Sequence, residues 1–152
     1  MNYRYVDMET YARKSHFEYF DRLAYPYVGV TVNVDITELS RTVKGNNLPF
    51  FLTTCYCVSQ AANKVPEFRQ RIVEHQIVEY EYCRTSHTVA LEDGTYCYCD
   101  LNSSCPFEEY VDYAKQEQEN AKKRRSIHES WEEALEDNSA GTRAKRGVLT
   151  VV

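Results

Sequence analysis

Residues 88–99 read T-V-A-L-E-D-G-T-Y-C-Y-C, and this stretch decides the fold that the sequence predicts. Its centre, Asp93-Gly94, is a strong turn signal, because glycine adopts the backbone angles of a tight hairpin at no steric cost. Residues 88–91 and 95–99 flank the turn as strands of an antiparallel hairpin. We therefore expect two paired strands here.

The strand pattern extends upstream of this hairpin. Between residues 72 and 101, Val78, Tyr80 and Tyr82 alternate with glutamates. Further upstream, residues 28–35 place valine at every second position, which predicts a strand with one buried face.

Helical patterns surround the strands. Residues 10–20 place apolar side chains at spacings of three and four, with Thr10 as the expected N-cap. A short helix is expected to begin at Thr37, with Gly45 ending it.

Three prolines mark the bounds of two further helices. Pro49 opens a helix with a sustained apolar stripe, and Pro66 stops it. Pro106 starts another helix, whose apolar periodicity fails after Ala114. Residues 115–137 are mostly charged or amide side chains. This order of elements predicts an α/β fold, a two-layer sandwich of helices on a largely antiparallel or mixed sheet.

Length and composition narrow the classes of function. A chain of 152 residues suits one domain, and a net charge of −5 gives no electrostatic reason to expect a nucleic-acid partner. No apolar run is long enough for a membrane span and no signal peptide opens the chain, so we expect a soluble, cytoplasmic protein. Residues 1–137 are expected to form the domain, with residues 138–152 as a disordered tail.

Six cysteines allow more than one interpretation. Their C-x-C spacing differs from that of structural zinc sites, and no histidine lies at a matching distance. Reduced packing cysteines are the main interpretation, since buried thiols behave as small hydrophobic groups. A metal or a disulfide remains the alternative. The cysteines are Cys55, Cys57, Cys83, Cys97, Cys99 and Cys105.

Four histidines are the candidate general bases: His16, His75, His87 and His128. None lies beside a nucleophile motif such as G-x-S-x-G. The chain also has no glycine-rich phosphate loop and no metal-binding histidine pair. The basic residues 122–125 are flanked by glutamates, which favours a solvated helix of mixed charge over a polyanion site.

Several stretches, in the same order, resemble the chloramphenicol acetyltransferase family. The resemblance covers residues 3–115, and its R-x-x-H-F-E and P-E-F-R blocks are fairly specific together. The matching stretches are RKSHFEYF (13–20), VNVDIT (32–37), AANKVPEFR (61–69), IVEY (77–80), SHTV (86–89) and TY (95–96).

This resemblance implies transfer of an acetyl group from acetyl-CoA to a hydroxyl of chloramphenicol, as in antibiotic resistance. It also implies a homotrimer with active sites between neighbouring subunits. In the family, a histidine in a late H-H-x-x-x-D-G motif is the general base, and a serine or threonine hydroxyl near a Pro-Trp pair helps to hold the oxyanion. No metal is implied.

Neither catalytic element occurs in these 152 residues, since Trp131 follows Ser130 and there is no His-His pair. We therefore expect an incomplete fold, truncated before the catalytic histidine, with no catalytic residue of its own and no activity alone. Arg13 matches a family arginine that pairs with the aspartate of the late motif, so we expect it to be unpaired.

The resemblance also assigns positions in the acceptor pocket. Tyr19 and Phe20 match aromatic residues that contact the antibiotic, and Ala24, Tyr96 and Tyr98 fall where the pocket wall continues. For each position, ordinary core packing is the alternative.

Three functional hypotheses follow. The first is a fragment or degenerate member of the acetyltransferase family that keeps most of the acceptor pocket. The second is a non-catalytic binding or interaction protein built on the same half-fold. The third is a full enzyme with His16 or His87 as the replacement base.

Overall fold

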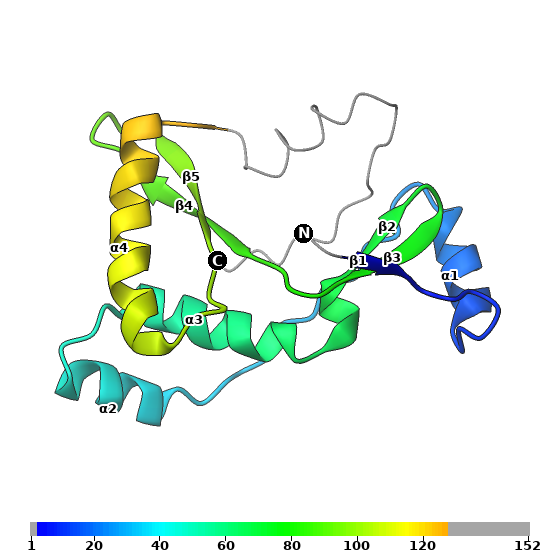
Figure 1. The fold of residues 1–152 in the computed structure, drawn as a ribbon, viewed down its shortest axis with the longest axis horizontal. Helices are drawn as coiled ribbons and strands as arrows, with labels where there is room; N and C mark the ends of the chain where they lie inside the picture. Colours follow the sequence, from blue (N-terminus) through cyan, green and yellow to red (C-terminus); the bar gives the residue numbers. More distant parts are fainter. Residues whose placement is uncertain (1–2, 128–152) are drawn as a thin grey trace.

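The computed structural model describes residues 3–127 (Figure 1). The elements are β1 (Tyr3–Tyr5), α1 (Lys14–Asp21), α2 (Thr37–Gly45), α3 (Phe50–Asn63), the 3₁₀-helix η1 (Pro66–Arg69), β2 (Gln70–Val73), β3 (Gln76–Tyr80), β4 (Thr85–Ala90), β5 (Tyr96–Leu101) and α4 (Phe107–Arg124). The predicted α/β class is confirmed, with helices packed against antiparallel sheets. No helix in residues 3–127 has the length and apolar content needed to cross a membrane.

The hairpin predicted around Asp93-Gly94 is present. Strands β4 and β5 pair antiparallel, with Ala90 opposite Tyr96 at the closed end. Gly94 adopts a φ of 80°, a backbone conformation that is strained for a residue with a Cβ but not for glycine. The Asp93 carboxylate accepts hydrogen bonds from the backbone N–H of Thr95 at 3.0 Å and from its hydroxyl at 2.6 Å, which closes the turn. The local sequence therefore sets the hairpin.

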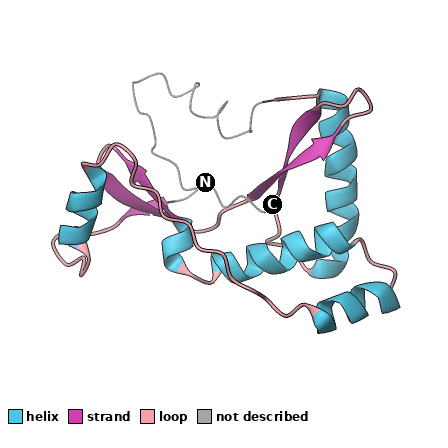
Figure 2. Ribbon diagram, turned by 180° about the vertical axis from the view of Figure 1, so that it is seen from behind, coloured by secondary structure: helices cyan, strands magenta, loops and turns pink. Residues whose placement is uncertain are grey.

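The main core lies where α3 and α4 pack on this hairpin (Figure 2). It includes Leu52 of α3 and Tyr110 of α4, which is completely buried. Burying a large apolar side chain contributes about 1.5–3 kcal/mol, so this cluster provides much of the fold's stability. The complete cluster is Leu52, Val89, Cys97, Cys99, Leu101, Tyr110, Val111, Ala114 and Ala121.

The other sheet has three antiparallel strands in the order β1-β3-β2. Glu74 and His75 form the two-residue turn between β2 and β3, and both have positive φ. Helix α1 lies beside this sheet, at the end of the molecule away from α4 (Figure 1). A carboxylate oxygen of Asp21 is 2.5 Å from Nδ1 of His75, which connects the end of α1 to the β2–β3 turn.

One predicted helix bound was wrong. Helix α1 begins at Lys14 rather than near Thr10, whose hydroxyl instead donates to the Asp7 carboxylate at 3.0 Å. Helix α4 runs on past Ala114 to Arg124, so the basic residues 122–124 lie on a helix of mixed charge, as the sequence favoured. Lys, Glu, Gln and Ala have high helix propensity, so the helix persists where the apolar stripe fails.

The predicted strand at residues 28–35 is not formed. The segment is an extended connection between α1 and α2, and Val28 is 91% exposed. Its alternating valines would suit one buried face, but no strand within residues 3–127 pairs with it. The tail predicted for residues 138–152 lies outside the described residues.

Candidate functional site

A cavity of about 370 Å³ lies between α1, the chain that follows it, and strands β2 and β3. Its walls are largely apolar and aromatic, which suits a small aromatic ligand. Helix α1 contributes Phe17, Phe20 and Asp21, and Ala24 follows from the chain beyond the helix, so this segment forms one wall. The lining residues are Phe17, Phe20, Asp21, Ala24, Pro26, Tyr27, Gln70, Arg71, Ile72 and Ile77.

The structure brings together only some of the predicted pocket residues. Phe20 and Ala24 line the cavity. Tyr19 is 63% exposed, and its ring lies edge-on to that of Phe20 with centroids 5.4 Å apart. Tyr96 and Tyr98 lie on β5 in the other sheet, and their rings contact each other in an edge-to-face arrangement. The five positions therefore do not form one site within the described chain.

The polar groups of the cavity were missed by the sequence reasoning. Asp21 comes from the end of α1, and Gln70 and Arg71 come from β2. The spacing of three and four residues from Phe17 to Phe20 and Asp21 could have identified the helical part of the wall. The sequence around Gln70 and Arg71 has no comparable spacing that would predict their place at the cavity.

The histidines occupy three different settings. His16 is exposed on α1, while His75 is paired with Asp21. His87 is buried on β4, where its Nε2 is 3.0 Å from the Gln118 amide nitrogen. Burial lowers the pKa of His87, with Asp100 acting in the opposite direction. None of the three lines the cavity, and His128 lies outside the described residues.

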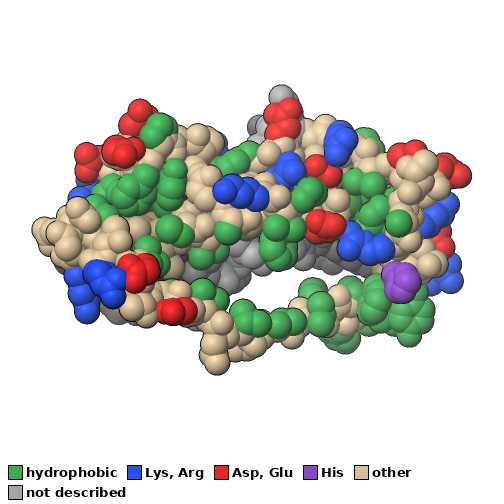
Figure 3. Space-filling view, turned by 90° about the horizontal axis from the view of Figure 1, so that it is seen from below, with side chains coloured by type: hydrophobic (Ala, Val, Ile, Leu, Met, Phe, Trp, Pro, Cys, Tyr) green, Lys and Arg blue, Asp and Glu red, His purple; other side chains and the backbone are tan. Residues whose placement is uncertain are grey.

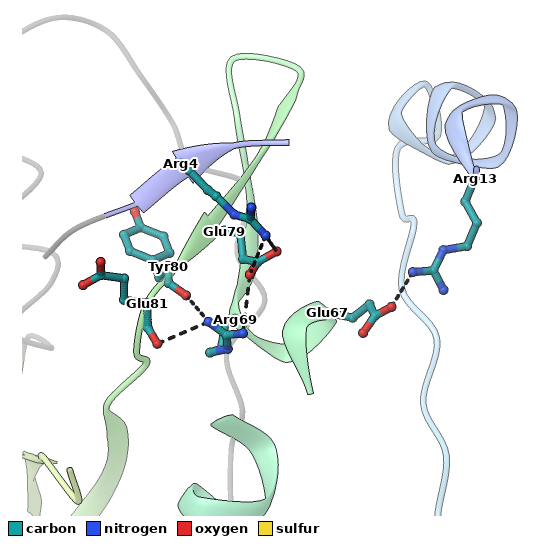
Figure 4. A network of polar contacts seen from close by, with 7 residues as sticks. All are labelled: Arg4, Arg13, Glu67, Arg69, Glu79, Tyr80 and Glu81. Atoms are coloured by element: carbon teal, nitrogen blue, oxygen red, sulfur yellow. Dashed lines mark hydrogen bonds and ion pairs between the residues drawn. The ribbon is translucent and has the colours of Figure 1, made fainter. Parts of the chain in front are cut away.

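Arg13 is paired, contrary to expectation. Its guanidinium donates to the Glu67 carboxylate at 2.6 Å, linking α1 to η1 (Figure 4). The hydrogen bond from Arg13 is the main cause that lowers the pKa of Glu67. Both side chains are about half exposed, so this ion pair adds little to the free energy of folding. Its main effect is to hold α1 and η1 in their relative orientation.

The described cysteines are all unpaired thiols. Burial raises the pKa of Cys55 to about 11 and that of Cys99 to about 12. Both thiols are therefore protonated at neutral pH and pack as apolar groups, in line with the main sequence interpretation. Within residues 3–127, no three His, Cys, Asp or Glu side chains gather as metal ligands do.

Helices packed on antiparallel sheets, with an aromatic-lined cavity beside the first helix, define an α/β domain suited to a small apolar ligand. The sequence pattern of chloramphenicol acetyltransferase matches residues 1–139. This chain therefore belongs to the chloramphenicol acetyltransferase family.

Curated relatives agree with this family assignment, and a solved structure agrees with the fold. A chloramphenicol acetyltransferase from Proteus mirabilis is 34% identical over 84 residues, which is 55% of this chain and 39% of that protein. Chloramphenicol acetyltransferase 3 from Escherichia coli is 26% identical over 112 residues, or 74% of this chain and 51% of that protein. A solved chloramphenicol acetyltransferase superposes with a TM-score of 0.79 at 23% identity, covering 90% of this chain and 64% of that one. The chain thus spans about half or less of these curated relatives.

Proposed function

We propose that this chain forms an acceptor-binding part of a chloramphenicol O-acetyltransferase, with acetyl-CoA as the co-substrate. The observation that carries the proposal is the cavity beside α1. Its lining includes Phe20 and Ala24, two positions that the resemblance assigned to the acceptor pocket. A nitrophenyl ring would contact Phe20 and Tyr27, with Ile72 and Ile77 completing an apolar surface.

The second part of the proposal is that the chain does not transfer acetyl groups on its own. Attack of an acceptor hydroxyl on the thioester carbonyl needs a base within hydrogen-bond reach of that hydroxyl. His87 is unsuited to this role, because its ring is buried and its Nε2 faces Gln118. His16 and His75 are not among the residues that line the cavity. The base would then come from chain beyond these residues or from a neighbouring subunit of a family-type trimer.

Ligand binding without catalysis is the second candidate function. The same cavity supports it, since apolar walls are sufficient to hold an aromatic ligand in the absence of a base. The two functions differ only in whether bound chloramphenicol is acetylated.

Calorimetric titration with chloramphenicol tests the binding step. Phe20→Ala should weaken binding about tenfold, because it removes a ring that would contact the ligand. Phe50→Ala is the matched control, since Phe50 is 47% exposed on α3 and Phe20 is 50% exposed on α1. Equal affinities of the two variants would contradict the assignment of the cavity.

Thiol release from acetyl-CoA, with and without chloramphenicol, tests the catalytic step. We expect no acceptor-dependent release by the purified chain. Turnover of about one per second, a typical enzyme rate, that is lost in His16→Ala or His87→Ala would support the replacement-base hypothesis instead.

A further inference from the structure

The extended connection between α1 and α2 is exposed on all sides. Val28 is 91% exposed, Val30 81%, Val32 69% and Val34 72%. No residue from 24 to 34 makes a hydrogen bond within residues 3–127, so the backbone N–H and C=O groups of this stretch face solvent. Figure 3 shows open space between part of the stretch and the rest of the molecule. An extended segment of this kind is an edge on which another strand can pair.

Two features set the ends of the stretch that can pair. Pro26 has no backbone N–H and cannot donate to a neighbouring strand. At the other end, the Asp35 carboxylate accepts hydrogen bonds from the backbone N–H of Thr37 at 2.9 Å and from its hydroxyl at 2.6 Å, where α2 begins. The valine segment, residues 27–35, lies between these two features and has Thr31 at its centre.

The pattern of the valine segment suits pairing with a second copy of itself. Antiparallel pairing centred on Thr31 places Val28 opposite Val34 and Val30 opposite Val32, because the numbers of opposed residues have a constant sum. The valines of both copies then share one face of the two-stranded ribbon. On the other face Thr31 meets its own copy, and a threonine pair is favourable across antiparallel strands.

Charge and area indicate what kind of complex this pairing gives. Residues 23–34 carry no charge, so two copies can approach here without like-charge repulsion, although each chain has a net charge of −5. A standard stable interface takes about 20–30 residues from each partner. The valine segment supplies fewer than half as many, which predicts a weak dimer with a dissociation constant on the order of micromolar or weaker.

We propose that the valine segment is a self-association surface, on which two copies of this chain pair antiparallel about a twofold axis at Thr31. The backbone groups that face solvent in one copy then hydrogen-bond to those of the other. The same edge is used by both copies, so the assembly closes as a dimer. The proposal does not depend on acetyl transfer or on the cavity beside α1.

Disulfide cross-linking tests the register. Every variant carries Cys57→Ser, because Cys57 is exposed and could cross-link by itself. Thr31→Cys places two thiols opposite each other on the axis, within the Cα separation of about 4.4–6.8 Å that a disulfide spans. Asn33→Cys is the matched control at another exposed position, since its two copies lie four residues apart along the ribbon, or about 14 Å. Mild oxidation should give a covalent dimer from Thr31→Cys and none from Asn33→Cys.

Two further variants strengthen the test. A mixture of Gly29→Cys and Asn33→Cys chains should cross-link, because these two positions are opposed between copies, and an added Cβ at Gly29 meets nothing within 4 Å. Val30→Lys should weaken the dimer about tenfold or more in analytical ultracentrifugation, the loss expected when one apolar contact is removed from each copy.

Equal cross-linking of Thr31→Cys and Asn33→Cys would overturn the proposal, because every residue meets its own copy when strands pair parallel and in register. A monomer at all concentrations would also overturn it and would leave the valine segment to a different polypeptide. Oligomers larger than a dimer would overturn the closed twofold arrangement. Chloramphenicol binding is measured separately, so its failure would not affect the result.

Discussion

His87 lies on β4 between two helices. Its ring centroid is 5.1 Å from that of Phe51 on α3, and its Nε2 faces the amide of Gln118 on α4. An amide nitrogen can donate only to an unprotonated ring nitrogen, so this contact requires the neutral imidazole. Burial acts in the same direction and lowers the pKa of His87, against the opposing effect of Asp100.

This depressed pKa predicts a loss of stability in acid. In the unfolded chain His87 titrates near its ordinary pKa of 6.5, so the unfolded state binds the proton more readily than the folded state. The contribution of neutral His87 is fully present above pH 6.5 and is lost as the pH falls through the lower folded pKa. Urea unfolding should show that the free energy of unfolding falls between pH 8 and pH 5. Carboxylates are still largely ionised over this pH range, so the fall reports on histidine.

Two variants separate His87 from the other groups. His87→Gln should reduce the pH dependence of stability, because glutamine does not titrate. His16→Gln changes an exposed histidine and should leave the dependence as it is. The assignment fails if the two variants give the same profile.

A buried hydroxyl network offers a second prediction at the residue scale. The Ser103 hydroxyl donates to that of Ser59 at 2.5 Å and lies 2.7 Å from the Tyr82 hydroxyl. Ser103→Ala leaves these partners without one of their hydrogen bonds, so the free energy of unfolding should fall by about 1–3 kcal/mol. The neighbouring Ser104→Ala, on an exposed residue, should change it by less than about 0.5 kcal/mol. Chemical denaturation measures both values.

At the scale of elements, α4 is the informative case. Its second half carries charged and amide side chains, yet Ala121 is 1% exposed and belongs to the main core. A small side chain at this position lets the last turns of α4 approach the hairpin. The helix ends at Arg124 and is capped by Arg125, whose φ of 54° is left-handed and whose backbone N–H donates to the carbonyl of Ala121 at 2.8 Å.

Ala121→Leu should therefore destabilise the fold. Inserting a larger side chain into a packed site costs about 1–3 kcal/mol, whereas Lys123→Leu places the same side chain on an exposed position. Thermal unfolding of the two variants compares them directly. A lower midpoint for Lys123→Leu than for Ala121→Leu would show that this part of α4 does not pack on the hairpin.

The elements that could be predicted from the sequence have local causes. The β4–β5 hairpin depends on Asp93-Gly94, and α3 begins directly after Pro49, as the sequence predicted. Features that depend on distant partners could not be predicted. Arg13 pairs with Glu67, 54 positions away, and Arg71 reaches the cavity only because β2 lies beside α1. The valines at residues 28–35 have strand periodicity, but periodicity does not supply a neighbouring strand.

At the scale of the whole molecule, the connection between α1 and α2 is the most exposed apolar feature. Figure 3 shows hydrophobic side chains along this stretch, which forms the lower edge of the view. An unpaired segment of alternating valines is a template for strand pairing between molecules. Its exposed large apolar residues are Leu23, Tyr25, Tyr27, Val28, Val30, Val32, Val34 and Ile36.

We expect the chain to associate as its concentration rises, and Val30→Lys should reduce this association by placing a charge in the segment. Light scattering against concentration measures the effect. Ile127→Lys is the control, because Ile127 is also an exposed apolar residue, 66% exposed, but lies outside the segment. A monodisperse unsubstituted chain at all concentrations would contradict this prediction.

The division into two sheets also has a consequence for the order of folding. All members of the main core lie between residues 52 and 121, so this nucleus can form from a continuous length of chain. Strand β1 is different, because its Arg4 pairs with Glu79 of β3, 75 positions away. Closing so large a loop costs chain entropy before the pairing repays it. Strand β1 precedes the other described strands in the chain, yet it is expected to be among the last of them to pair.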